Sequence, residues 1–168
     1  SSSAAARAEH VWSTEQGELA VFEIVCWTDG HRDARIASTT QNTSYEKFFS
    51  ASKFIHKQEK NLTEVMLHGK DNIKGLSSFQ NIKIIGGIEN ELREGLVSFS
   101  LPDIPSEAIV KGLNEKGIRT HIRKSDHYSG NILEPLGLKN CVRVSMCHYN
   151  TEEEVLQFLT SMNEIVHL

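Results

Sequence analysis

The stretch that decides the fold runs from Val142 to Val155 and reads V-R-V-S-M-C-H-Y-N-T-E-E-E-V. Apolar and polar residues alternate in its first part, which is typical of a strand with one buried face. Thr151 and Glu154 have the spacing of a capping box, and apolar residues recur at helical intervals after Val155. This stretch therefore predicts a short strand that leads through a capped turn into an amphipathic helix.

One arginine, Arg143, lies in the middle of that predicted strand. A guanidinium is costly to bury without an anionic partner, and its planar fork matches a carboxylate bidentately. Two interpretations follow from the residues alone. Arg143 either anchors the carboxylate of a substrate, or lies on the solvent side of an edge strand and pairs with a nearby glutamate.

The rest of the chain from Tyr45 onward has clear periodicity. Helices are expected between 45 and 69, from 105 to 117, from 132 to 138 and after 151, and strands at 82–87, 96–101, 118–122 and 141–146. The order α-β-β-α-β-α-β-α with short connections predicts an α+β fold, in which helices pack on one face of a small, mainly antiparallel sheet.

The first 45 residues are harder to read. An apolar run at 19–27 predicts a buried strand, whereas 31–44 is polar and has no period. We expect an N-terminal extension over 1–45, partly disordered, and one domain over 46–168.

Composition narrows the function classes. A net charge of −4 and a pI near 6.1 give no electrostatic attraction to nucleic acid or to an anionic membrane. No apolar run approaches the ~20 residues needed to span a bilayer. Cys26, Cys141 and Cys147 form no C-x-x-C pair, which argues against a zinc site or a disulfide framework. We expect a cytoplasmic protein without a bound metal.

The Arg143 stretch, the segment from Gly95 to Phe99 and the segment from Gly117 to Gly130 together resemble a known domain. It is the C-terminal small domain of the class V aminotransferase-fold enzymes, which include cysteine desulfurases, selenocysteine lyases and isopenicillin-epimerase-like proteins. The resemblance covers about two thirds of the chain, from Glu59 on. It implies pyridoxal 5'-phosphate (PLP) as cofactor and Arg143 as the residue that binds the carboxylate of an amino-acid substrate.

The segment from His121 to Asn131 is rich in groups that could contact a substrate. His121, Arg123 and His127 are the candidates, and a solvated surface loop is the alternative. Because His121 and Arg123 alternate at the end of a predicted strand, they are expected to share one face.

The chain also departs from the family it resembles. Those enzymes hold PLP in a large domain, on a lysine that follows a strand. The best match here, Lys53, lies at the start of a predicted helix, so it is interpreted as a surface residue. Desulfurases also carry a nucleophilic cysteine on the loop that corresponds to 121–131, and this chain has none there. No catalytic residue is therefore expected in this chain.

Three functional hypotheses remain. The leading one is a substrate-carboxylate-binding small domain of a PLP-dependent aminotransferase- or desulfurase-like enzyme, a transferase or lyase. This hypothesis treats the chain as a fragment, inactive alone, that works with a large PLP domain or a homodimer partner. The alternative is a stand-alone, non-catalytic binding or interaction module derived from that domain. A third hypothesis, a short enzyme with its own site, depends only on the histidine-rich segment.

Overall fold

A computed structural model describes residues 44–167 of the 168-residue chain. In this described part, the α-helices are α4 Ser44–His68, α5 Ser106–Glu115, α6 Gly130–Leu133 and α7 Glu152–Val166. The strands are β1 Gly69–Lys70, β2 Ile73–Lys74, β3 Lys83–Ile84, β4 Leu96–Ser100, β5 His121–Lys124 and β6 Asn140–Ser145. A short 3-10 turn, η1, covers Leu76–Ser78.

The main sheet has four strands in the order β3-β4-β6-β5, and every neighbouring pair is antiparallel. On one face, Val97 is paired with Val144 and Phe99 with Val142. All four side chains are buried. Alternation along the strands places Ser98, Arg143 and Ser145 on the opposite face, which we call the open face.

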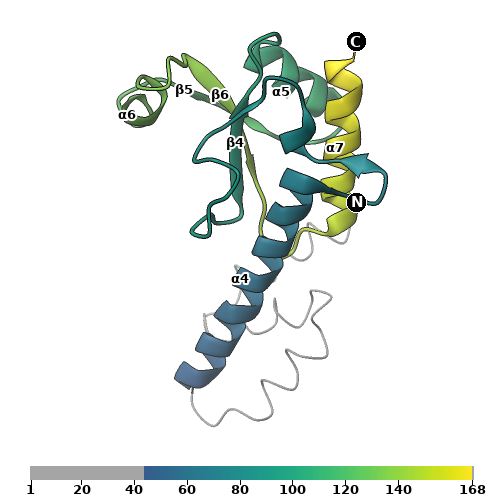
Figure 1. Cartoon of the computed structure of the whole chain (residues 1–168). Coiled ribbons are helices and arrows are strands. Elements are labelled where there is room, and N and C mark those ends of the chain that lie inside the picture. Colours follow the sequence, from purple (N-terminus) through teal and green to yellow (C-terminus); the bar gives the residue numbers. More distant parts are fainter. Residues whose placement is uncertain (1–43, 168) are drawn as a thin grey trace. The chain divides into compact units, whose positions relative to one another are not determined.

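Helices α5 and α7 lie beside one another on one side of the sheet (Figure 1). The core lies between them and the strands, and the C-terminal part of α4 contributes to it through Leu62, Val65 and Met66. Phe99, Leu113 and Leu159 are fully buried. The predicted α+β class, with a small antiparallel sheet, is confirmed.

Helix α7 begins with the predicted capping box. The Thr151 hydroxyl accepts a hydrogen bond from the Glu154 amide at 3.3 Å, and the Glu154 carboxylate accepts one from the Thr151 amide at 3.0 Å. Replacement of Thr151 with alanine leaves the Glu154 amide without this partner. We expect a loss of about 1 kcal/mol in the free energy of unfolding. Urea denaturation monitors this change, with Thr160→Ala, in the exposed middle of α7, as the control.

The structure corrects several element boundaries. Between the helix predicted over 45–69 and the strand predicted at 82–87 lies the β1–β2 hairpin, in which Gly69 pairs with Lys74. The strand predicted at 118–122 is displaced to His121–Lys124, because the chain must first leave α5 through Gly117, whose φ is +79°. The strand predicted at 82–87 pairs only at Lys83–Ile84, and two glycines with positive φ follow it. The short helix predicted at 132–138 lies earlier, at Gly130–Leu133.

The chain is divided into two compact units. One of them comprises Lys60–Met146 and the residues from Asn150 on, and it contains the four-stranded sheet. The predicted domain boundary at residue 46 remains a prediction. The strand expected at 19–27, the polar segment 31–44 and Cys26 lie outside the described residues. None of the helices in the described part of the chain is both long and apolar enough to cross a membrane.

Candidate functional site

The open face carries a row of polar residues centred on Arg143. Arg143 in β6 is paired with Ser98 of β4 on one side and with His121 of β5 on the other. Directly opposed residues in an antiparallel sheet have Cβ atoms about 4.5–5.5 Å apart. The register therefore brings together three polar side chains that are far apart in the sequence.

The Arg143 side chain is partly buried, and its Nε donates a hydrogen bond to the Ser145 hydroxyl at 3.2 Å. Among the described residues, no carboxylate lies within ion-pair distance of the Arg143 guanidinium. The glutamate pairing considered as an alternative from the sequence is therefore absent from this part of the chain. Ser145 orients the guanidinium, whose remaining N–H groups can bind an anion.

Arg123 lies on the same face as His121, two residues further along β5, and both side chains are exposed. Arg123 is paired with Cys141, whose side chain is almost fully buried. Burial raises the pKa of the Cys141 thiol, and Arg123 and a hydrogen bond with Ser98 partly oppose that rise. This cysteine is therefore held as a thiol rather than as a reactive thiolate.

His127 does not join the Arg143 row. It lies in the turn after β5, exposed, and its ring packs against that of Tyr128 with centroids 3.9 Å apart. The neighbouring Asp126 carboxylate accepts hydrogen bonds from the Tyr128 and Ser129 amides, both at 3.0 Å. The structure thus places three of the four predicted binding residues, Arg143, His121 and Arg123, on one face and separates the fourth. Their binding role remains a prediction.

The Asp126 turn should respond to acid. Hydrogen bonds from the Ser129 and Tyr128 amides lower the pKa of the Asp126 carboxyl. Because the folded-state pKa lies below the unfolded one, the stabilisation is present above about pH 3.9 and is lost as pH falls through the folded value. We expect the amide NMR signals of Tyr128 and Ser129 to titrate with a midpoint below about 3.9. The Asp126→Asn variant should abolish that titration, and a midpoint above this value would contradict the assignment.

One end of the open face is covered. Lys83 is paired with Ser100 and so lies on this face, and its ammonium donates a hydrogen bond to the Leu136 carbonyl at 3.2 Å. The segment after α6 therefore reaches over the Ser100 end of the sheet. The Arg143 row is two residues away from this cover along β4 and β6.

A site for PLP makes specific demands on its residues. The cofactor needs a lysine for covalent attachment and a carboxylate for its pyridine nitrogen. The open-face lysine, Lys83, is engaged with the Leu136 carbonyl, and the Asp126 carboxylate is turned toward two backbone amides. Lys53 lies within α4, as its position in the sequence indicated. The described part of this chain therefore fits a carboxylate but not the full set of PLP contacts.

The model of the family described as "Aminotransferase class-V" matches residues 47–158. This match spans more than half of the 168 residues. The chain belongs to the aminotransferase class-V family. The resemblance inferred from the Arg143 stretch is thereby confirmed.

Curated relatives of this class-V chain include a probable cysteine desulfurase of Staphylococcus epidermidis, 27% identical over 110 residues. That alignment covers 66% of this chain and 24% of the relative. A cysteine desulfurase of Haloferax volcanii is 36% identical over 80 residues, 48% of this chain and 18% of the relative. The chain thus spans about a quarter or less of the length of these relatives.

Solved structures show the same fold. The apo structure of cysteine desulfurase from Thermococcus onnurineus NA1 matches with a TM-score of 0.57 and 26% identity, over 73% of this chain and 28% of that one. The cysteine desulfurase CsdA of Escherichia coli matches with a TM-score of 0.56 and 17% identity, over 76% of this chain and 31% of that one. The second likeness shows the fold alone.

Reasoning from the sequence missed two residues that flank Arg143, namely Ser98 and Ser145. Alternation along 96–101 was sufficient to place the Ser98 side chain on the other face of the sheet from Val97 and Phe99. The sequence does not predict which residue of β4 is paired with Arg143, because the register is decided by how β4 and β6 align in the folded sheet.

Proposed function

We propose that this chain supplies the substrate-carboxylate site of a PLP-dependent enzyme that acts on an amino acid. The supporting observation is the Arg143 guanidinium, oriented by Ser145, flanked by Ser98 and His121, and without a carboxylate partner among the described residues. Arg143 binds the α-carboxylate bidentately, and Arg123 and His121 add donors beside it. His127 lies outside the Arg143 row, so it would contribute to carboxylate binding only if the turn after β5 moved.

PLP belongs to a large domain in this proposal, either on a longer polypeptide or in a partner chain. When bound there, it supplies the electron sink for chemistry at the α-amino group of the substrate. This chain fixes the carboxylate, and it thereby orients the Cα substituents toward that domain. A homodimer partner could complete the same site.

The reaction that we assign is transamination, epimerisation or elimination, which makes the whole enzyme a transferase, an isomerase or a lyase acting in amino-acid metabolism. Desulfuration through a persulfide needs a reactive thiolate on the segment 121–131, where this chain has no cysteine. Cys141 does not replace it, since its thiol is buried and its pKa is raised. We place the enzyme in the cytoplasm, as the composition indicates.

The test uses NMR titration of the full 168-residue chain, labelled with 15N. Propionate and L-alanine should both shift the amide signals of Ser98, Arg143 and Ser145, because the open face needs only a carboxylate. Ethylamine, which lacks the carboxylate, should leave them unchanged. Equal shifts with ethylamine, or none with either carboxylate, would contradict the proposed function.

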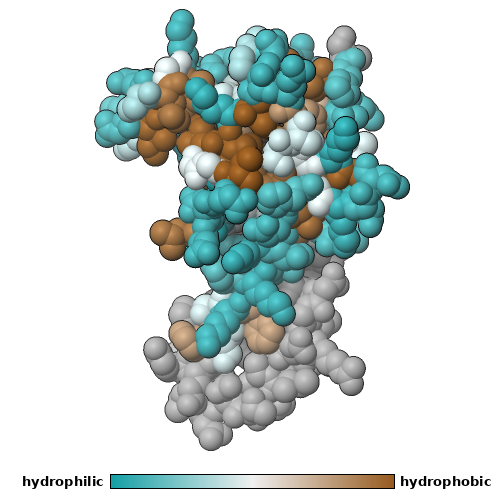
Figure 2. Space-filling model, viewed as in Figure 1, coloured by the Kyte–Doolittle hydropathy of each residue, from teal (hydrophilic) through white to brown (hydrophobic). Residues whose placement is uncertain are grey.

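A second candidate function is that of a binding module, and the exposed apolar surface around α6 supports it. Figure 2 shows apolar side chains gathered at this end of the molecule. Ile132 is 57% exposed and Leu136 is 39% exposed, and the nearby Tyr128 is 80% exposed. Exposed apolar patches commonly mark interaction sites. If a second copy of the chain covers the patch, light scattering should show a dimer that Ile132→Asp dissociates, whereas a monomer would support docking on another domain.

A further inference from the structure

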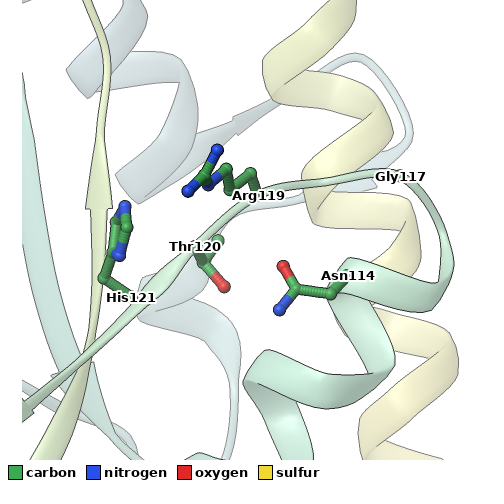
Figure 3. Close-up of a pocket in the computed structure, with 5 residues that line it drawn as sticks. All are labelled: Asn114, Gly117, Arg119, Thr120 and His121. Atoms are coloured by element: carbon green, nitrogen blue, oxygen red, sulfur yellow. The ribbon is translucent and has the colours of Figure 1, made fainter.

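Arginines gather on the open face around His121. Arg143 is paired with His121, and Arg123 follows His121 by two residues in β5, so both arginines lie on the same face as this histidine. The Arg119 side chain also lies on the His121 side of the chain (Figure 3). Three of the four arginines in the described residues therefore share one face, and the fourth, Arg93, donates to backbone carbonyls.

The charge of this arginine cluster is not balanced from within. Among the described residues, no carboxylate lies within ion-pair distance of any of its three guanidinium groups. Carboxylates of neighbouring segments are engaged with uncharged donors instead: Asp126 with two backbone amides, and Glu107 with the Asn140 side chain at 2.7 Å. Like charges on neighbouring strands destabilise a sheet, so an anion from outside would stabilise this face.

Two of these guanidinium groups face opposite ends of β6. Arg143 reaches toward Ser145 through the hydrogen bond from its Nε. Burial raises the pKa of the Cys141 thiol and the charge of Arg123 opposes that rise, so the Arg123 guanidinium lies close to Cys141, its partner in the sheet. Cys141 and Ser145 are four residues apart on β6, which is about 14 Å along an extended strand. A single carboxylate cannot bind both groups bidentately, whereas two carboxylates joined by a short carbon chain can.

We propose that the amino-acid substrate of this site is a diacid, with one carboxylate at Cα and a second on its side chain. This statement rests on the proposed function, in which Arg143 binds the α-carboxylate. Arg123 binds the side-chain carboxylate, His121 lies between the two groups, and Arg119 adds a positive charge beside His121. With a substrate that has a single carboxylate, Arg123 lacks a charged partner and serves only as a further donor.

L-glutamate and L-glutamine are matched probes, because they share a shape and differ in the charge of the side chain. In NMR titrations of the full 168-residue chain, both should shift the amide signals of Ser98 and Ser145. L-glutamate should bind about fivefold more tightly, as one additional exposed charge pair allows, and it alone should shift the Arg123 and Cys141 amides. Equal affinity for the two would overturn the diacid proposal and leave the proposed function intact. No shift of Ser98 or Ser145 with either ligand would overturn both.

A second pair of probes separates two anchored carboxylates from attraction to net charge alone. Glutarate and malonate are both dianions, but the two carboxylates of malonate share one carbon and cannot reach both guanidinium groups. At constant ionic strength, glutarate should bind several-fold more tightly than malonate. Equal affinity for the two dianions would mean that the arginine cluster attracts anions in general, and it would overturn the proposal.

Arg123→Ala should abolish the preference for L-glutamate over L-glutamine. Because the Arg123 side chain is exposed, this variant should keep the Tm of the original chain. Lys124→Ala is the matched control, since Lys124 is the next residue of β5, is exposed, has the same charge and points to the other face. The preference should survive in Lys124→Ala. If it also survived in Arg123→Ala, Arg123 would not bind the side-chain carboxylate and the proposal would be wrong.

Discussion

Arg143→Ala is expected to lower the kcat/KM of the proposed PLP-dependent enzyme by about 30- to 1,000-fold. Removal of one partner from a hydrogen-bonded charge pair costs about 2–4 kcal/mol, and each 1.4 kcal/mol corresponds to a factor of ten. The loss should fall on kcat and KM together, because the proposed carboxylate contact would both bind the substrate and orient it.

Arg143→Lys distinguishes charge from geometry. A lysine keeps the positive charge but loses the planar fork and the Nε–H that donates to Ser145. We expect an activity between those of the original enzyme and the alanine variant. Recovery of full activity by lysine would mean that charge alone suffices, which contradicts a bidentate anchor.

The matched control for Arg143→Ala is Lys139→Ala. Lys139 is exposed, lies just before β6, and has the same charge. Its substitution should leave kcat/KM and Tm unchanged. Arg143→Ala should likewise leave Tm nearly unchanged, since the described residues offer the guanidinium no carboxylate partner. If Arg143→Ala lowered the Tm by several degrees as well as lowering kcat/KM, Arg143 would have a structural role instead.

The sequence predicted the elements that carry their own periodicity. The α7 cap, the β6 strand and helix α5 each depend on residues within a few positions of one another, and all three were predicted. The alternation of His121 and Arg123 likewise predicted that they share a face, as the pairing of β5 with β6 shows. Local spacing decides such features before any tertiary contact forms.

Features that depend on contacts between distant segments could not be predicted in this way. The pairing of Ser98 with Arg143 depends on how β4 and β6 align, and the strands of the β1–β2 hairpin are too short to show a period. The burial of the Thr120 hydroxyl without a hydrogen-bond partner among the described residues depends on how the end of α5 lies against β5. Thr120 was therefore treated only as part of a predicted strand.

Gly75→Ala is expected to be among the most destabilising single substitutions in this chain. A Cβ at position 75 would lie 2.3 Å from the Gly69 nitrogen and 2.4 Å from both the His68 carbonyl carbon and the Leu67 oxygen. All three are backbone atoms, so no side-chain rotation can relieve the clash. The backbone of Gly75 itself is ordinary, with φ at −76°, and the effect is therefore steric.

The clash at position 75 should displace the β1–β2 hairpin and thereby weaken its contacts with α7. Gly75 follows β2, and β1 and β2 both contact α7, which Lys70 also joins through an ion pair with Glu152. A displaced hairpin would loosen this connection between the end of α4 and α7. We expect a loss of about 3 kcal/mol or more in the free energy of unfolding, because such overpacking cannot relax locally. The Tm should fall by roughly 10 °C or more.

Gly87→Ala is the matched control for Gly75→Ala. Gly87 has a φ of +77°, but no atom lies within 4 Å of a Cβ built there. Alanine should therefore cost only about 1 kcal/mol at this position, from backbone strain alone. Thermal unfolding of the two variants thus compares a steric clash with backbone strain in the same chain. If Gly75→Ala were no more destabilising than Gly87→Ala, that result would contradict the close approach of the Gly75 backbone to the end of α4.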